Sequence, residues 1–235
     1  MDLGFDFTEK DRILVVAPHP DDEAIGCGGL LALYPNLCDV LVLTDGRRGR
    51  SKSRLHVSDE KMAATRRSES ESAMAIAGVK NITFLGIPDC RLAENRKAVF
   101  GFDFSPYTYI FIPNTFEEHP DHGNAAKFIR QLRLRGRTKA KICEYEVWSA
   151  MPQTDVILDI SAVEEKKLAM LSCYKSQLEC RDYLRAVPGL NRYRGMQAFI
   201  ESAEAFRYSM ASFGERVRLF FKGRKKPVPA IWKAE

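Results

Sequence analysis

The first half of the chain repeats one pattern, in which a short apolar run is followed by a longer amphipathic stretch. The apolar runs cover residues 13–17, 40–44, 82–85 and 109–112. Short runs of consecutive apolar residues are typical of strands buried on both faces, and a helix-length stretch between them supplies the crossover that joins parallel strands. The sequence therefore predicts an α/β fold with a mainly parallel sheet flanked by helices.

Other elements follow from periodicity and from glycine and proline positions. A helix is expected over 60–78, with Gly78 in the left-handed conformation that ends many helices. Another is expected from His122 or Gly123 to about residue 135. Further strands are predicted at 141–147 and 155–159, and further helices at 162–177 and 196–206. No repeat or linker divides the 235 residues, so we expect one domain over 1–235, ending in a basic tail at 213–235.

The composition is that of an ordinary globular protein, with 45% hydrophobic and 29% charged residues. No apolar run is long enough to span a bilayer, and the acidic N-terminal segment lacks the order of a signal peptide. The six cysteines are scattered without a C-x-x-C pair, a pattern typical of reduced thiols. We therefore expect a cytoplasmic protein; the oligomeric state stays open.

Two polar clusters each follow a predicted strand: 18–23 (PHPDDE) and 118–122 (EHPDH). They contain three of the four histidines in the chain, and the fourth, His56, falls in a polar basic loop. Adjacent acids repel one another unless a cation compensates them, and mixed nitrogen and oxygen donors suit zinc or a neighbouring transition metal. Because parallel strands bring such loops to one edge of the sheet, the clusters predict one site. The residues do not show which aspartate would bind the metal. They also leave open a purely structural alternative, in which an aspartate caps a helix and a neutral histidine packs beside it.

The clusters resemble the paired motifs of the LmbE-like, or PIG-L, deacetylase family, which has PHPDDE after the first strand and HPDH after a later one. The resemblance covers about residues 11–206. It includes the TDG turn at 44–46, the helix at 66–79, the strand exit with Asp89, the helix at 166–177, and the RG and AEAF elements at 194–195 and 203–206. It implies a Rossmann-like sheet and a hydrolase with one zinc per chain that removes the acetyl group from N-acetylglucosamine-type substrates.

Roles for individual residues come from the same resemblance. The implied zinc ligands are His19, Asp22 and His122. Three protein ligands leave a fourth position for water, as expected of catalytic zinc. Asp21 would be the general base, and a cationic His119, oriented by Asp121, would stabilise the oxyanion or protonate the leaving amine.

The chain departs from the family at the turn after the second strand, where Arg47 and Arg48 stand in place of frequent acids. Guanidinium groups bind phosphate or carboxylate, so we expect an anionic or lipid-linked N-acetylated sugar. The substrate-binding residues that we predict are Arg47, Arg48, Arg66, Arg67 and Asp89. The tail segment 216–226 interleaves basic and aromatic residues; it is either a solvated helix or a peripheral membrane contact.

The alternative function is a nucleotide- or nucleic-acid-binding module without hydrolase activity. The glycines at 26, 28 and 29 follow a strand, and the net charge is +5. However, the G-x-G-x-x-G spacing is absent, and the acids at 21–23 would repel a pyrophosphate. No basic-aromatic module for nucleic acid is recognisable. We expect these glycines to permit close helix packing, and we expect no nucleic-acid partner. A two-metal phosphatase is a further alternative, which product analysis would separate.

Overall fold

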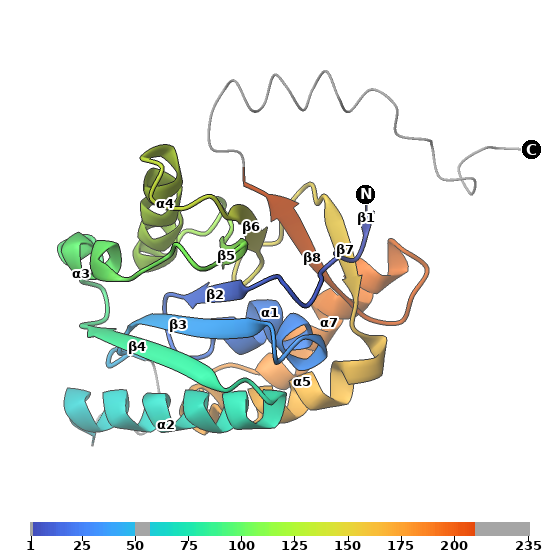
Figure 1. Cartoon of the computed structure of the whole chain (residues 1–235). Coiled ribbons are helices and arrows are strands. Elements are labelled where there is room, and N and C mark those ends of the chain that lie inside the picture. Colours follow the sequence, from blue (N-terminus) through green and yellow to red (C-terminus); the bar gives the residue numbers. More distant parts are fainter. Residues whose placement is uncertain (1, 50–56, 210–235) are drawn as a thin grey trace, which may run out of the picture.

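The computed structural model describes residues 2–49 and 57–209 (Figure 1). Within them, eight strands form one sheet in the order β1-β7-β8-β6-β5-β2-β3-β4. The strands are β1 (Asp2–Leu3), β2 (Ile13–Ala17), β3 (Cys38–Thr44), β4 (Asn81–Ile87), β5 (Tyr109–Pro113), β6 (Lys141–Tyr145), β7 (Val156–Asp159) and β8 (Ala203–Tyr208). The helices are α1 (Asp22–Leu33), α2 (Asp59–Ala77), α3 (Arg96–Gly101), α4 (Pro120–Leu134), α5 (Glu164–Leu171), α6 (Lys175–Leu178) and α7 (Tyr183–Met196), with a 3-10 turn at Ser161–Val163.

The sheet is mainly parallel, as predicted. β2 pairs in parallel with β3 and β5, β3 with β4, and β5 with β6. Only β8 runs against its neighbours, pairing antiparallel with β6 and β7. The carboxyl ends of β2, β3, β4 and β5 therefore open on the same edge of the sheet.

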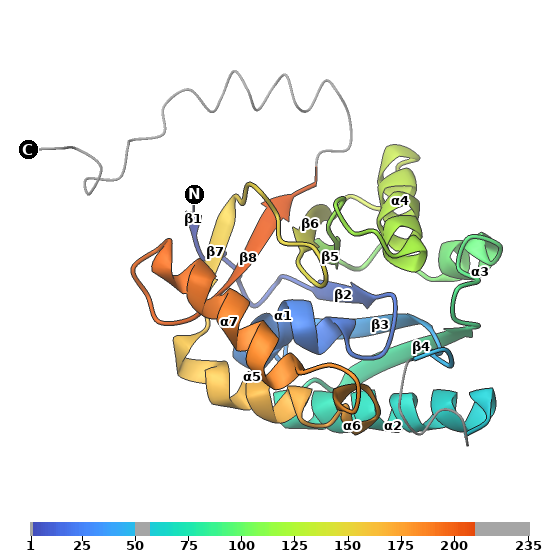
Figure 2. The ribbon, with the colours of Figure 1, turned by 180° about the vertical axis from the view of Figure 1, so that it is seen from behind.

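Helices cover both faces of the sheet, which explains why a central strand such as β2 is apolar throughout. Ile13, Val15 and Ala17 of β2 face a core shared with α1, α2 and α5, whereas Leu14 and Val16 face a core shared with α4. Figure 2 shows α1 and α7 in front of the strands on the first side. The expected α/β fold is confirmed.

The glycines of α1 permit close packing, as expected. A Cβ atom at Gly26 would lie 2.2 Å from the ring of Tyr145, and one at Gly29 would lie 2.3 Å from Ile160. These helix positions are filled by protein, so they form no phosphate cradle. No helix in the described ranges is long and apolar enough to cross a membrane.

The helix predicted at 196–206 is wrong. The helix in this region is α7, and β8 follows it. Alanine and glutamate favour a helix at 203–206. However, the Glu204 carboxylate accepts hydrogen bonds from the amides of Gly29 and Leu30 and forms an ion pair with Lys167. These long-range contacts, together with pairing to β7, override local propensity.

Two other predicted helices have different bounds. The segment at 162–177 is divided into a 3-10 turn, α5 and α6, because the buried Tyr174 turns inward and donates a hydrogen bond to Glu23. The helix expected from His122 or Gly123 begins at Pro120, with His119 as its N-cap. Proline suits the first helical position because its missing N–H would have no partner there. His122 therefore lies inside the first turn of α4.

Candidate metal centre

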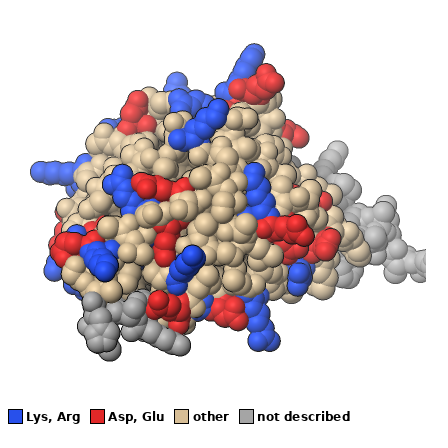
Figure 3. Space-filling view, turned by 90° about the horizontal axis from the view of Figure 1, so that it is seen from below, with Lys and Arg blue, Asp and Glu red and all other residues tan. Residues whose placement is uncertain are grey.

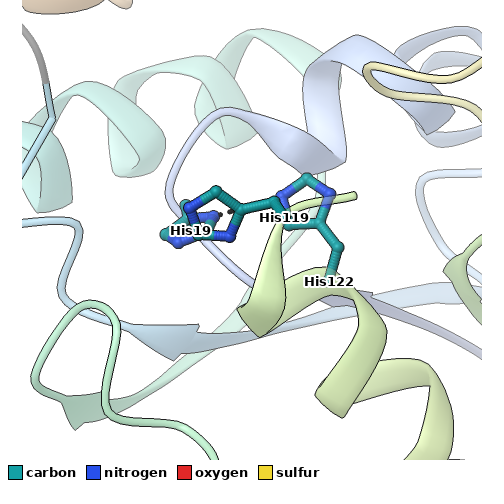
Figure 4. A group of neighbouring side chains, drawn as sticks. All are labelled: His19, His119 and His122. Atoms are coloured by element: carbon teal, nitrogen blue, oxygen red, sulfur yellow. Dashed lines mark hydrogen bonds between the residues drawn. The ribbon is translucent and has the colours of Figure 1, made fainter. Parts of the chain in front are cut away.

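A cleft of about 890 Å³ lies at the carboxyl ends of the parallel strands. Its walls come from the loops after β2, β3, β4 and β5, represented by His19, Arg48, Asp89 and His119. His19 follows β2, and His122 lies in α4, 103 residues further along the chain. Nevertheless, a nitrogen of one imidazole is 3.3 Å from a nitrogen of the other. Figure 4 shows the rings of His19, His119 and His122 gathered at one place.

The three predicted metal ligands lie in contact with one another. Oδ2 of Asp22 is 3.2 Å from Nδ1 of His19 and 3.2 Å from Nε2 of His122, and these two nitrogens are 3.3 Å apart. A tetrahedral ion with bonds of about 2.0–2.1 Å places its ligand atoms about 3.3–3.4 Å apart. The donor atoms therefore fit a zinc-sized ion.

The electrostatics of this triad also suit a cation. Burial disfavours a charge on His122, but Asp22 outweighs it and raises the pKa of His122 to about 9. Burial would raise the pKa of Asp22, but His122 and His19 hold that pKa well below its usual range. Asp22 thus stays ionised where positive charge is favoured.

Carboxylates lie against the outer nitrogens of the two histidines that are predicted as ligands. Nδ1 of His122 is 3.2 Å from Glu117. Nε2 of His19 is 3.2 Å from Asp89 and 3.5 Å from Asp121, although it makes no well-aligned hydrogen bond to either. Carboxylates behind metal-bound histidines fix the ring orientation and the tautomer. Sequence reasoning missed Glu117, although it lies one residue before the second cluster.

Glu117→Gln is expected to weaken zinc binding by roughly 10- to 100-fold, the usual effect of losing such a partner. Glu117 also accepts hydrogen bonds from the amides of Val147, Trp148 and Ser149, so it connects His122 to the cleft wall. Competition against a metal-binding dye measures the affinity. The adjacent, exposed Glu118 provides the matched control, Glu118→Gln, and an equal loss in both variants would refute a specific role for Glu117.

Asp21 is held in a strained and buried position at the start of α1. Its φ is 136°, a value that non-glycine residues rarely adopt and that is often found at functional sites. Its carboxylate pairs with Arg66 at 2.9 Å, and its amide donates to Glu23. Burial raises the pKa of Asp21 to about 7, against the opposing effect of Arg66. Asp21 also lines the cleft, so it can exchange a proton there near neutral pH.

His119 is half-buried beside the triad, and its contact with Asp121 differs from the expected one. The Asp121 backbone N–H donates to Nδ1 of His119, while the Asp121 carboxylate accepts from the amide of Cys90. Burial, followed by the nearby imidazoles of His19 and His122, lowers the pKa of His119. This direction opposes the expectation of a cationic His119. With Nδ1 accepting, the neutral ring carries its hydrogen on Nε2.

The four predicted arginines do not form one anion site. Arg47 pairs with Asp45 at 2.6 Å and does not line the cleft. Arg67 pairs with Glu71 and lies over the ring of Phe84, in a different hollow. The sequence could not show that Arg48 lines the cleft while Arg47 and Arg67 do not, because the positions of these residues in the chain do not reveal where their side chains point.

Arg66 lines the cleft, but its guanidinium is bound to protein. It donates to the carbonyls of Gly46 and Pro20 and pairs with Asp21. Arg48 and Asp89 line the cleft, and the Arg48 amide donates to Asp89. Arg66 is therefore held by Asp21 and by two backbone carbonyls, whereas Arg48 forms part of the cleft wall.

The structure adds cleft residues that sequence reasoning missed. Trp148 and Tyr183 line the cleft from distant segments, and Arg181 lies over the Trp148 ring at 4.3 Å. Tyr183 donates a hydrogen bond to Asp21. No local motif marks these residues, because they belong to the β6–β7 connection and to the entry of α7.

One face of the described molecule carries charges of both signs. Figure 3 shows a face on which basic and acidic side chains are interspersed. A basic stripe of one sign, which nucleic-acid binding requires, is not seen on that face. The tail at 213–235, including 216–226, lies outside the described residues, as does His56.

Comparison with known proteins gives concordant matches. The model of the GlcNAc-PI de-N-acetylase family, PIG-L, matches residues 14–132, a range that contains both clusters. A diacetylchitobiose deacetylase from Thermococcus kodakarensis is 34% identical over 133 residues, 51% of this chain and 48% of that protein. The match thus spans about half the length of that relative.

Two further relatives cover more of the chain. A probable N-acetyl-alpha-D-glucosaminyl L-malate deacetylase 2 from Bacillus cereus is 26% identical over 190 residues, 72% of this chain and 84% of that protein. The structure of N,N'-diacetylchitobiose deacetylase from Pyrococcus horikoshii superposes with a TM-score of 0.74 at 22% identity, covering 86% of this chain and 84% of the other.

Proposed function

Since the chain belongs to the PIG-L family of GlcNAc-PI de-N-acetylases, we propose that it is a zinc-dependent hydrolase that removes the N-acetyl group from an N-acetylglucosamine-type sugar. The observation that carries the proposal is the mutual contact of the donor atoms of His19, Asp22 and His122 at 3.2–3.3 Å. The relatives named above deacetylate N-acetylated sugars according to their descriptions, which supports the reaction class.

His19, Asp22 and His122 would hold the zinc. Bound there, zinc supplies Lewis acidity, which lowers the pKa of water and polarises a carbonyl group. Asp22 provides the negative charge, and Glu117 and Asp89 orient the two imidazoles from behind. One tightly bound zinc per chain is the proposed content.

Asp21 is the proposed general base. It lines the cleft without belonging to the triad, and its raised pKa of about 7 suits a group that accepts a proton near neutral pH. Arg66 and Tyr183 hold its carboxylate in one orientation. In the proposed reaction, Asp21 takes the proton of the attacking water and passes it to the leaving amine.

His119 is the proposed oxyanion donor. Its ring centroid lies 4.7 Å from that of His19 and 5.2 Å from that of His122. Because Nδ1 accepts the Asp121 N–H, Nε2–H is available to donate to the amide carbonyl as negative charge develops. A neutral donor performs this role, so the lowered pKa of His119 is compatible with it.

The substrate is proposed to carry an anionic group near the sugar. Arg48 and Arg181 both line the cleft around the metal centre, and charge-assisted hydrogen bonds from guanidinium groups are the stronger kind. A lipid-linked form and a peripheral membrane contact are finer proposals that depend on residues 213–235, beyond the described ranges.

Acetate release tests both the reaction and the substrate charge. The zinc-loaded protein is assayed with N-acetylglucosamine, its 1-phosphate and a diphosphate conjugate. We expect kcat/KM to be higher for the charged forms and to fall by roughly 10- to 100-fold for them in Arg48→Ala or Arg181→Ala, since a hydrogen bond to a charged group contributes about 1.5–3 kcal/mol.

Arg47→Ala is the matched control, because Arg47 lies outside the cleft. High salt should weaken the preference for charged sugars in the wild type. Equal rates on neutral and charged sugars would refute the anion proposal, and no acetate from any of them would refute the proposed function.

A further inference from the structure

A thiol faces the cleft beside the metal centre. Cys90 follows Asp89 in the loop after β4, is exposed, and has a φ of 65°, in the left-handed region that favours glycine. Its amide donates to the Asp121 carboxylate at 2.8 Å, and its Sγ lies 3.4 Å from Oδ1 of Asp89. The loop is thus tied down with the sulfur against a carboxylate.

His119 completes a three-donor cluster with these residues. Donor atoms of Asp89, Cys90 and His119 all lie within 4.8 Å of one another, and the three residues line the same cleft. Thiolate sulfur, imidazole nitrogen and carboxylate oxygen are the donors that zinc binds, and sulfur disfavours magnesium and calcium. The cluster therefore has the chemistry of a zinc site.

The His19 imidazole borders the same cluster. Nε2 of His19 makes no hydrogen bond within the described residues, although the His19 side chain is only 9% exposed. This nitrogen faces Asp89, on the side of the ring opposite Nδ1, which faces Asp22. The His19 ring thus separates the triad from the Asp89–Cys90–His119 cluster.

We propose that Asp89, Cys90 and His119 form a second, weaker zinc site, and that zinc bound there inhibits the enzyme by occupying His119. The inhibitory part rests on the proposed function, whereas the binding part does not. The second site is weaker because its donors must approach one another and because the Cys90 thiol must release its proton to solvent on binding. The first site has no sulfur donor, so the two are chemically distinguishable.

Cobalt titration tests the binding directly. Metal-free protein, in a buffer with a phosphine reductant that keeps Cys90 reduced, is titrated with Co²⁺. Absorption is followed in the visible and near-ultraviolet. The first equivalent should give visible bands without sulfur-to-cobalt charge transfer, because its ligands are nitrogen and oxygen. The second should give the charge-transfer band through Cys90.

The charge-transfer band should be absent in Cys90→Ser and in Cys90→Gly. Glycine suits the left-handed backbone conformation at this position, so the second variant should fold normally. The band should persist in Cys180→Ser, which removes the other exposed cysteine of the described ranges. A wild-type protein without the band, or a band that survives both Cys90 variants, would overturn the site. If the charge-transfer band grows with the first equivalent of Co²⁺, the Cys90 site is the tighter one, and the proposed order of affinity is wrong.

Inhibition is measured separately as acetate release against zinc added beyond the first equivalent. Wild-type activity should fall, and Cys90→Ser should need at least roughly 10- to 100-fold more zinc for the same inhibition, because loss of a direct ligand should cost at least as much as loss of a residue that orients a ligand. Equal inhibition of both proteins would overturn the inhibitory role while the cobalt band still reports binding. If the protein releases no acetate at all, the proposed function fails and the cobalt result still decides the site.

Discussion

Asp22→Asn is expected to lose bound zinc and turnover together, whereas Asp21→Asn should keep the zinc and lose 10²- to 10⁴-fold in kcat, roughly the contribution of general acid–base catalysis. The two variants are isosteric and adjacent. Asp22 contacts both ligand imidazoles, so its amide analogue removes the only negative charge of the triad. Asp21 contacts Arg66 and Tyr183 instead.

The two variants are compared by measuring their zinc content after dialysis and their steady-state kinetics on the same preparations. Circular dichroism and thermal unfolding establish that both variants are folded, which matters because Asp21→Asn leaves the buried Arg66 without its anionic partner. A zinc-free Asp21→Asn together with a zinc-loaded Asp22→Asn would reverse the division of roles that we propose. Normal turnover in Asp21→Asn would assign the base to another group.

The second large effect concerns stability. Arg66→Met should lower the free energy of unfolding by about 3–5 kcal/mol, because breaking a buried ion pair leaves an uncompensated charge. Arg66 is 3% exposed and joins α2 to the segment after β2, through Pro20 and Asp21, and to the turn after β3, through Gly46. Methionine fills similar volume, so the loss would reflect the missing charge and hydrogen bonds more than a cavity.

The adjacent Arg67→Met is the matched control and should cost less than about 1 kcal/mol, because exposed ion pairs contribute little. Arg67 has an i,i+4 pair with Glu71 and a cation–π contact with Phe84. Urea unfolding of the metal-free proteins measures both values. Similar losses in the two variants would show that Arg66 has no special structural role.

Local sequence patterns were enough to predict the core of the sheet and the two polar clusters. Strands buried on both faces leave a local signature, because every residue in the run must be apolar, as in Ile13–Ala17. Parallel order then places the loops after β2 and β5 at one edge. The residue types in those loops, three imidazoles among several carboxylates, predict a metal centre before any distance is known, and the family resemblance adds the ligand set.

Which side chains surround the proposed centre depends on contacts between segments that are far apart in the sequence. Arg66 and Arg67 are neighbours with the same charge, yet one is buried against Asp21 and the other lies on the surface. Glu117 reaches His122, and the Asp121 carboxylate accepts from the Cys90 amide while the Asp121 backbone N–H donates to His119. Residues 203–206 pair as a strand because Glu204 finds amide and lysine partners far away in sequence. Helix propensities and motifs are local properties, whereas burial, ion pairing and strand pairing depend on contacts across the whole chain, and these decided the rest.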